Sequence, residues 1–389
     1  MESRKKLVDV VIGTRPEAIK MAPVIEELAR HGSEIDVRVL ATGQHREMLD
    51  QVLGFFAISA DINLDIMTQG QSLADVTSRC LTRLTTVLDD RPSSLMLVHG
   101  DTTTTLAASL GAFYQNIPIG HVEAGLRSFD LQNPFPEEAN RKIVDGLCDL
   151  HFAPTEQART NLLGEGIAED TIWQTGNTAI DALRTAVALV ESEDSILDEQ
   201  KQGGEIAKPY VLVTAHRREN FGVPIRNLCH AISEASRELG DLEFVYPVHP
   251  NPNILKPVRE ILAENQRIRL IEPTDYASFV RLMKNCEFIL TDSGGIQEEG
   301  PSLGKPVLVL RNVTERPEAV DAGTAVLVGT EKDDIKSWIM RLALNVEAKA
   351  TMANAINPYG DGHASERIVC AIRNWLGLTD RVPEEFQSR

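Results

Sequence analysis

Acidic and histidine side chains follow several short apolar runs of the sequence, at the points where parallel strands would end. Asp101, Glu123 and His216 each come close after such a run, and Glu137 opens an amphipathic segment. Because the carboxyl ends of parallel strands meet at one edge of a sheet, we expect these side chains to converge. Carboxylates near one another push their pKa values apart, so that one accepts a proton while another donates one. The pattern predicts acid–base chemistry that needs no metal ion.

Each of these carboxylates, taken singly, also has a structural interpretation. Asp101 and Glu138 would serve equally well as helix N-caps or as partners in salt bridges. Glu123 differs, because it lies in the small-residue turn GHVEAGLRS, where a charge has little structural use. The functional interpretation gains weight because several such side chains follow strands in one chain.

The segment 291–318 combines a strand end, a glycine-rich break and an acidic helix face. The break at 293–295 would leave backbone N–H groups free to bind phosphate oxygens. About one turn later, the carboxylates of Glu298 and Glu299 suit vicinal hydroxyls such as those of a ribose. The alternative is a glycine-rich turn capped by Asp292 and followed by a solvated acidic helix. The segment therefore predicts a nucleotide clamp or, failing that, an ordinary helix start.

Short β-branched runs alternate with amphipathic segments along the whole chain, as in parallel α/β proteins. The apolar runs are 8–13, 36–42, 95–100, 117–124 and 150–155 in the first half, and 210–216, 243–249, 268–273, 287–293, 305–310 and 324–329 in the second. An acidic, Gln-rich stretch at 186–208 separates the halves and predicts a hinge. Two such sheets facing each other would form a cleft lined by the carboxyl ends of strands.

Composition limits the partners and the compartment. The 389 residues fit two domains of ordinary size. The formal net charge of −18 argues against nucleic acid or an anionic membrane as partner. The five cysteines are scattered and never form a C-x-x-C pair, and no apolar run is long enough to cross a bilayer. We expect a soluble protein of the reducing cytoplasm.

Clustered cations in so acidic a chain are candidates for binding phosphate groups. Arg15 and Lys20 open the first predicted helix, and Arg316 lies near the end of segment 291–318. The G-x-x-x-x-G-K-[ST] loop is missing, as is a G-x-G-x-x-G after the first strand, which removes the usual signatures of ATP hydrolysis and NAD binding. There is also no H-E-x-x-H motif and no pair of Asp residues two apart. We therefore expect neither a cofactor nor a metal ion.

The motifs as a set resemble the non-hydrolysing UDP-N-acetylglucosamine (UDP-GlcNAc) 2-epimerases. The matching stretches cover nearly the whole chain in order: GTRPEAIKMAP, TGQH, HGDTTT, HVEAGLRS, PFPEEANR, APTE, TGNT, HRREN, HPNP, TDSGGIQEE, LGKPVLVLR and TERPEA. The resemblance implies the glycosyltransferase-B fold, with two Rossmann-like domains facing across a cleft. It implies an N-terminal domain at 1–180 joined by a last helix at 363–389 that crosses back, and a UDP-binding domain at 181–362.

The resemblance also implies the reaction and its residues. UDP-GlcNAc and UDP-N-acetylmannosamine (UDP-ManNAc) would interconvert by anti-elimination of UDP to a 2-acetamidoglucal and its re-addition. Carried over by motif, the catalytic residues are Asp101, Glu123, Glu137 and His216, and the UDP-sugar contacts are Arg15, Lys20, Phe279, Ser293, Gly294, Gly295, Glu299 and Arg316. Gln44, Arg217 and His249 match a second site at which UDP-GlcNAc activates some bacterial members. Family members are commonly homodimers, and we expect the same here.

Two further enzyme activities and one binding function fit the same fold. A hydrolysing epimerase would release free ManNAc and UDP, and a retaining glycosyltransferase would need an acceptor groove. A nucleotide-sugar sensor would have no need for Asp101, Glu123 and Glu137 together. The cluster of carboxylates favours the epimerase, although it does not say which carboxylate serves which face of the sugar.

Overall fold

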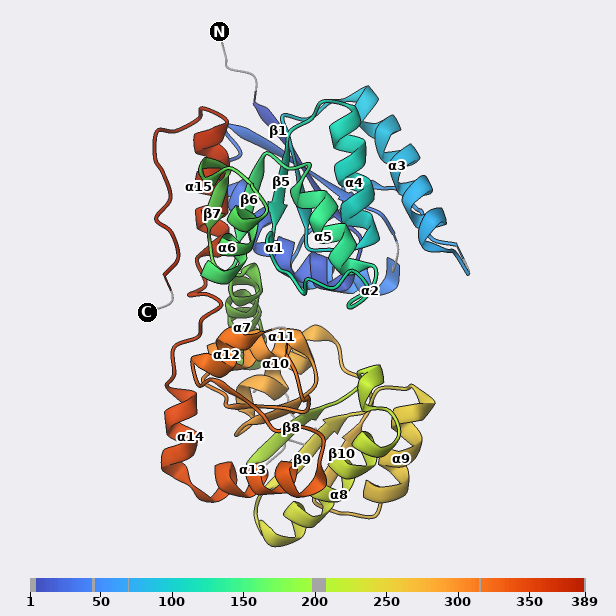
Figure 1. Ribbon diagram of the computed structural model, residues 1–389, viewed down its shortest axis with the longest axis vertical. Coiled ribbons are helices and arrows are strands. Elements are labelled where there is room, and N and C mark those ends of the chain that lie inside the picture. Colours follow the sequence, from blue (N-terminus) through green and yellow to red (C-terminus); the bar gives the residue numbers. More distant parts are fainter. Residues whose placement is uncertain (1–4, 44–45, 69, 198–207, 315, 388–389) are drawn as a thin grey trace. The chain divides into compact units, whose positions relative to one another are not determined.

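The chain folds into two α/β units in the computed structural model, which describes residues 5–43, 46–68, 70–197, 208–314 and 316–387. Contacts between Cα atoms separate unit 1, residues Met1–Arg184 with Gly360–Ser388, from unit 2, residues Thr185–Tyr359. Figure 1 shows both units with their elements labelled. Among the described residues, no helix is both long and apolar enough to cross a membrane.

Unit 1 alternates strands and helices and takes its last helix from the end of the chain. Its elements are β1 (Lys6–Ile12), α1 (Arg15–Arg30), β2 (Ile35–Ala41), α2 (Arg46–Phe55), β3 (Ile62–Asn63), α3 (Leu73–Asp90), β4 (Leu95–His99), α4 (Thr103–Tyr114), β5 (Ile119–Val122), α5 (Glu137–Asp145), β6 (Leu150–Ala153), α6 (Glu156–Gly164), η1 (Glu169–Thr171), β7 (Ile172–Gln174), the beginning of α7 (Thr178–Leu197), and α15 (Ala364–Trp375).

The unit 1 strands form one parallel sheet in the order β3-β2-β1-β4-β5-β6-β7. Helices cover the sheet in two groups, since α1 contacts α2 and α15 while α4 contacts α3 and α5. Figure 1 shows α15 and α3 on opposite sides of the unit. Strand order reverses between β1 and β4, and ligands of open parallel sheets bind beside such a switch point. The loops after β1, β4 and β5 are therefore the ones expected to carry function.

The carboxylate of Glu17 joins the first two of these loops. Thr14 caps α1 in a capping box, and the carboxylate of Glu17 accepts hydrogen bonds from the backbone N–H groups of Gly13 and Thr14 at 2.7 and 2.6 Å. Its other oxygen accepts from the hydroxyl of Thr102, the N-cap of α4, at 2.6 Å. Burial raises the pKa of Glu17, although these hydrogen bonds oppose the shift. One buried side chain thus ties the β1–α1 loop to the β4–α4 loop.

The C-terminal segment completes unit 1. Asp181, near the start of α7, accepts hydrogen bonds from the backbone N–H groups of Ala364 and Ser365 at 3.2 and 2.7 Å, so it caps α15 from another helix. Helix α15 packs on α1. Beyond it, the side chain of Gln174 donates to the carbonyl of Phe386 at 2.8 Å. Hydrogen bonds and helix packing therefore join the C-terminal segment to parts of unit 1 that are far from it in the sequence.

Unit 2 repeats the alternation. Its elements are β8 (Tyr210–Thr214), η2 (Arg218–Asn220), α8 (Val223–Glu238), β9 (Glu243–Pro247), α9 (Pro252–Leu262), β10 (Ile268–Ile271), α10 (Tyr276–Asn285), β11 (Ile289–Thr291), α11 (Gly294–Ser302), β12 (Val307–Val309), α12 (Pro317–Asp321), β13 (Ala325–Leu327), α13 (Lys332–Leu344) and α14 (Val346–Ala353).

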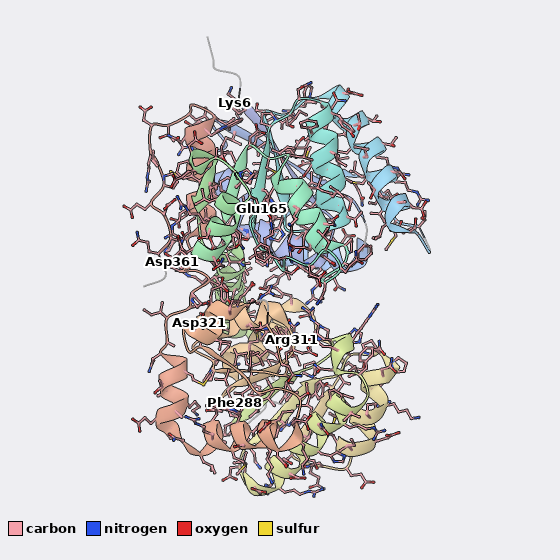
Figure 2. All side chains as sticks on the ribbon, viewed as in Figure 1. Lys6, Glu165, Phe288, Arg311, Asp321 and Asp361 are labelled. Carbon is pink, nitrogen blue, oxygen red and sulfur yellow. The ribbon has the colours of Figure 1, made fainter. Side chains whose placement is uncertain are left out.

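The unit 2 strands also form a parallel sheet, in the order β10-β9-β8-β11-β12-β13. Within this unit, α8 packs against α9 and α13, and Figure 1 shows α8 and α13 on one side of β8–β10 and α10–α12 on the other. Phe288, labelled in Figure 2, is fully buried in the core. The predicted fold class, α/β with two Rossmann-like halves, is confirmed by the two sheets. Strands β3 and β7 do not correspond to any of the apolar runs that were predicted to be strands.

Gly125 offers a test of how tightly the β5 loop is packed. Its φ is +84°, and a Cβ atom there would lie 2.3 Å from the carbonyl oxygen of Ala158 and 2.8 Å from Cγ of Leu162. We expect Gly125→Ala to lower the free energy of unfolding by about 2 kcal/mol or more, because both the backbone strain and the clash with a carbonyl must be relieved. Urea unfolding followed by circular dichroism measures the change.

The control is Gly164→Ala at the last residue of α6, where a Cβ atom would meet nothing within 4 Å. That replacement should leave stability unchanged or raise it by up to about 1 kcal/mol. Equal stability of the two variants would contradict the packing described for Gly125.

Candidate active site

Glu123 lies directly after β5 in a strained conformation that several side chains support. Its φ is +67°, a left-handed conformation that costs a residue other than glycine about 1–3 kcal/mol. Its side chain is 11% exposed, and its Oε2 forms an ion pair with Nζ of Lys20 and accepts a hydrogen bond from Nδ2 of Asn177 at 3.0 Å. The strain and the enclosed carboxylate make Glu123 the best-defined functional candidate in unit 1.

The ring of His99 lies close to the carboxylate of Glu123. Its Nε2 lies 3.8 Å from Oε2 of Glu123, and neither ring nitrogen has a hydrogen-bond partner within the described part of the chain. Burial lowers the pKa of His99 to about 4, although the negative charge of Glu123 opposes the shift. At neutral pH the ring is therefore an uncharged imidazole next to a carboxylate.

Two side chains of helix α5 hold Asp101. Its Oδ2 accepts hydrogen bonds from Nε and Nη2 of Arg141 at 2.9 and 2.5 Å, and its backbone carbonyl accepts from Nδ2 of Asn140 at 2.8 Å. Gly100, the preceding residue, faces Glu123, since a Cβ atom built there would lie 3.9 Å from Oε1 of Glu123. The structure thus brings the loops that carry Asp101 and Glu123 together.

The two adjacent glutamates at the start of α5 have different surroundings. Glu138 is fully buried, accepts hydrogen bonds from the backbone N–H groups of Ser128 and Phe129 at 2.9 and 3.0 Å, and pairs with Arg141 at 3.2 Å. This salt bridge agrees with the structural interpretation of Glu138. Glu137 is partly exposed, and its Oε2 is buried without a hydrogen-bond partner among the described residues. The two neighbours therefore differ, because backbone N–H groups and Arg141 bind the carboxylate of Glu138 and leave Oε2 of Glu137 without such a partner in the described part of the structure.

His216 lies after β8, in unit 2, and Asp292 organises the loop around it. The Oδ2 atom of Asp292 accepts hydrogen bonds at 2.8 Å from the backbone N–H groups of His216 and Arg217 and from the side chain of Asn220. Nδ1 of His216 lies 3.6 Å from Oδ1 of Asp292, and its ring stacks on His249 with centroids 5.8 Å apart. Partial burial lowers the pKa of His216, while the carboxylate of Asp292 acts in the opposite direction.

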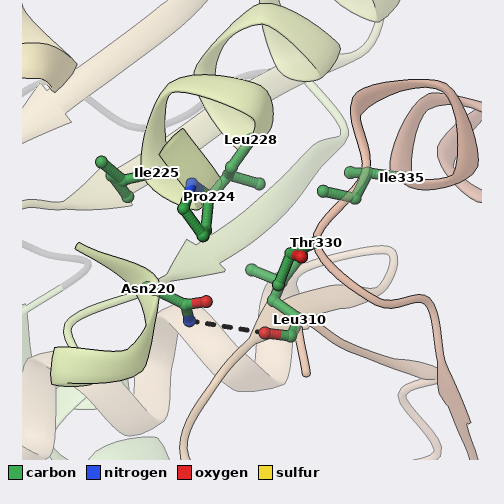
Figure 3. Close-up of a pocket in the computed structure, with 7 residues that line it drawn as sticks. All are labelled: Asn220, Pro224, Ile225, Leu228, Leu310, Thr330 and Ile335. Atoms are coloured by element: carbon green, nitrogen blue, oxygen red, sulfur yellow. Dashed lines mark hydrogen bonds between the residues drawn. The ribbon is translucent and has the colours of Figure 1, made fainter. Parts of the chain in front are cut away.

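A small cavity lies beneath this loop, and Figure 3 shows its lining. Asn220 borders it and also approaches the backbone carbonyl of Leu310, with 3.4 Å between Nδ2 and the oxygen. The remaining lining residues are Pro224, Ile225, Leu228, Thr330 and Ile335. Because this lining is largely apolar, the cavity does not suit a phosphate and belongs to the packing behind the loop.

The start of α11 carries the features of an anion site. Gly294 is buried, and a Cβ atom there would lie 2.7 Å from Cζ of Arg316, so the guanidinium occupies the place of a side chain. Nε of Arg316 donates to Oε1 of Glu298 at 2.7 Å. A helix N-terminus and an adjacent guanidinium both attract anionic groups. Glu298 is therefore a partner of Arg316. Glu299 lies on the same helix and is partly exposed.

The predicted site residues fall into two groups, one in each unit. Unit 1 contains Arg15, Lys20, Asp101, Glu123 and Glu137, and unit 2 contains His216, Arg217, His249, Phe279, Ser293, Gly294, Gly295, Glu299 and Arg316. Arg15 is partly exposed in the first turn of α1, and Phe279 is half-buried in α10. Gln44 lies outside the described residues. Activation at a second site and the homodimer stay predictions.

Sequence reasoning missed the side chains that hold the carboxylates. Asn177 was visible only within the stretch TGNT, and nothing in its spacing connected it with Glu123. Asp292 was considered only as a helix cap, whereas its carboxylate binds the loop after another strand. Arg141 pairs with both Asp101 and Glu138.

Comparison with known proteins identifies close relatives. The family model described as UDP-N-acetylglucosamine 2-epimerase matches residues 26–373. The UDP-N-acetylglucosamine 2-epimerases of Escherichia coli O157:H7 and Yersinia pestis are 51% and 52% identical over 367 residues, which cover 94% of this chain and 97% of theirs. The crystal structure of the Neisseria meningitidis UDP-GlcNAc 2-epimerase bound to UDP-GlcNAc has a TM-score of 0.86 and 50% identity, and the match covers 94% of this chain and 99% of that one.

The buried ring of His99 predicts a pH dependence of stability. In the unfolded chain a histidine has a pKa near 6.5, whereas the pKa of His99 in the folded protein is about 4. Above pH 6.5 the ring is neutral in both states; as the pH falls below 6.5, the unfolded chain binds a proton that the folded protein does not, so stability is lost. We expect His99→Gln to remove roughly 2 kcal/mol of the decline between pH 7 and pH 5.

Urea unfolding of the wild type and the variant at both pH values measures this difference. His230→Gln is the control, because it makes the same replacement at an exposed histidine. An unchanged decline in His99→Gln would show that His99 is not buried in its neutral form.

Proposed function

Because the chain belongs to the UDP-N-acetylglucosamine 2-epimerase family, we propose that it interconverts UDP-GlcNAc and UDP-ManNAc without hydrolysing them. The observation that carries the proposal is the enclosed carboxylate of Glu123, held on a left-handed backbone by Lys20 and Asn177 beside the loop of Asp101. Inverting a carbon centre through loss and return of its proton requires two acid–base groups, one for each face. Unit 1 supplies two carboxylates whose positions are fixed.

The proposed reaction conserves all atoms of the substrate. One group removes the proton from C2, the C1–O bond breaks, and its electron pair leaves with the β-phosphate of UDP. A double bond forms between C1 and C2, which gives the 2-acetamidoglucal. UDP then adds back to C1 while C2 receives a proton on its other face. Neither an oxidant nor a reductant takes part.

The surroundings of the carboxylates suit this chemistry. Lys20 and Asn177 orient Glu123, and Arg141 orients Asp101 through two hydrogen bonds that converge on Oδ2. Fixed orientation avoids the cost of arranging these groups during the reaction. Glu137, with an unpartnered buried oxygen, is the third acid–base candidate. Asp101, Glu123 and Glu137 thus share the proton transfers.

Unit 2 is assigned to the nucleotide. The N-terminus of α11, from Ser293 to Gly295, together with the guanidinium of Arg316, would hold the diphosphate. His216, on its organised loop, would stabilise the charge that develops on the leaving UDP. Glu299 would bind the ribose hydroxyls and Phe279 the uracil. Because UDP is a reactant again in the second half of the reaction, this site must retain it.

Turnover in deuterium oxide tests the reaction. We expect incubation with UDP-GlcNAc, without added metal ion or NAD, to give UDP-ManNAc with deuterium at C2, since the removed proton exchanges with solvent before it returns. Proton NMR and mass spectrometry detect the label. Product without deuterium would contradict the elimination, and release of free ManNAc would place the protein among hydrolysing epimerases.

Removal of the carboxylates tests their roles. We expect Asp101→Asn and Glu123→Gln each to lower kcat by about 10²- to 10⁴-fold, because each replacement removes an acid–base group, while calorimetric titration with UDP shows little change in affinity. The control is Asp36→Asn, a partly exposed carboxylate at the start of β2, at the end of the strand away from these loops. Near-normal turnover in either site variant would rule out its assigned role.

A further inference from the structure

We infer that Asp145 and His121, buried behind the site, are positioning residues that set the geometry of both the Asp101 loop and the Glu123 loop. The inference rests on the proposed function, because it concerns the step in which those carboxylates exchange protons with the substrate. Neither residue was a predicted site residue. Their side chains are 1% and 0% exposed.

Asp145, the last residue of α5, binds three different groups. Its Oδ1 lies 2.5 Å from Nδ1 of His121, and its Oδ2 accepts from Nη2 of Arg127 at 2.6 Å and from the backbone N–H of Gly125 at 3.3 Å. Burial by itself would raise the pKa of Asp145, but His121 and Arg127 outweigh burial and hold this pKa at about 2. The carboxylate is therefore ionised at all working pH values and acts only as an acceptor.

His121 carries the connection to Asp101. Its Nε2 donates to the carbonyl oxygen of Gly100 at 2.7 Å. A backbone carbonyl only accepts hydrogen bonds, so Nε2 of His121 is the donor in this bond. The carbonyl of Gly100 belongs to the peptide bond that joins it to Asp101, and φ of Gly100 is +65°. The imidazole thus fixes the peptide plane from which the Asp101 side chain extends.

The connection to Glu123 runs through the backbone. Glu123, at φ +67°, is followed two residues later by Gly125, whose N–H is bound by Asp145. Between them, the N–H of Ala124 donates to the carbonyl of Phe152 in β6 at 3.1 Å. A left-handed residue persists only where its surroundings hold it. Asp145 supplies one of these restraints, so a single buried carboxylate serves both loops.

The ion pair between Arg127 and Glu165 provides a matched control. Nη2 of Arg127 also pairs with Oε2 of Glu165, labelled in Figure 2, at 2.6 Å. Glu165 contacts Arg127 from the more exposed side, with 27% of its side chain accessible. Its other ion-pair partner among the described residues is Lys142, which belongs to neither loop. Glu165→Gln therefore removes a carboxylate from the same arginine and leaves Asp145 and His121 in place.

A second control matches the burial of Asp145. Asp9 in β1 is fully buried and pairs with Nε and Nη2 of Arg38 in β2, both at 2.7 Å. Asp9→Asn breaks a buried ion pair within unit 1 and should cost stability for the same reason as Asp145→Asn. The bonds of Asp9 reach neither site loop, so its replacement should leave the geometry of the carboxylates unchanged.

The test compares kinetics of Asp145→Asn with those of the two controls. We expect Asp145→Asn to lower kcat by about 10²-fold with little change in KM for UDP-GlcNAc, because small displacements of reacting groups have effects of this size. With substrate deuterated at C2, the isotope effect on kcat should rise, since proton transfer becomes slower relative to the other steps. Destabilisation alone reduces the amount of folded enzyme and leaves the isotope effect unchanged.

Two replacements of His121 each keep one of its two hydrogen bonds and remove the other. They test the positioning role even if Asp145→Asn does not fold. The amide nitrogen of glutamine reaches about the position of Nε2 and keeps the bond to Gly100, whereas that of asparagine reaches about the position of Nδ1 and keeps the bond to Asp145. We expect His121→Gln to retain at least about 10-fold more kcat than His121→Asn, because the bond next to Asp101 survives in it.

The outcomes distinguish the inference from the proposed function. If the wild type itself incorporates no deuterium at C2, the proposed function fails. If the wild type does so while Asp145→Asn keeps the wild-type kcat and isotope effect, the positioning role alone is overturned. Equal losses of kcat in Asp145→Asn and Asp9→Asn, or equal kcat in the two His121 variants, would likewise overturn it.

Discussion

In each sheet all strands run parallel, and this constraint decides where polar groups are needed. Every loop after a strand emerges at the same edge, and the backbone N–H groups of these loops have no neighbouring strand to bind. The chain satisfies many of them with buried carboxylates. Glu17 binds the loop after β1, Asp292 the loop after β8, and Glu138 the segment before α5. One oxygen of Glu17 and one of Asp292 each accept from two loop N–H groups, whereas the two oxygens of Glu138 each accept from one. Each carboxylate therefore joins two loop N–H groups and holds the loop in one conformation.

The same device explains why catalytic and structural acids are hard to separate by sequence. Glu137 and Glu138 are neighbours of the same type. Of the two, Glu138 is the one whose carboxylate accepts hydrogen bonds from backbone N–H groups. Consecutive helix residues point about 100° apart, so one faces the loop and the other does not. The strands could be predicted because buried parallel strands are continuous β-branched runs. The strands β3 and β7 have only two and three residues and show no such run.

The partners of the site residues were beyond sequence reasoning for a different reason. Asn177 lies 54 positions from Glu123, and His121 lies 24 positions from Asp145. Periodicity reports which face of an element is buried, and it carries no information about which loop a polar side chain reaches. Motif resemblance did point to Glu123 and Asp101 themselves. It did not show that each is paired with a cation, Lys20 and Arg141 respectively, in a chain of strong negative charge.

The carboxylate of Glu17 has a further consequence for motion. It accepts hydrogen bonds from Gly13 and Thr14 in one loop and from Thr102 in another, so neither loop can open without breaking bonds to the same side chain. Local openings of that kind govern how quickly a backbone amide exchanges its hydrogen with solvent. The amides of Gly13 and Thr105, although 92 positions apart, should therefore exchange as members of one cooperative unit.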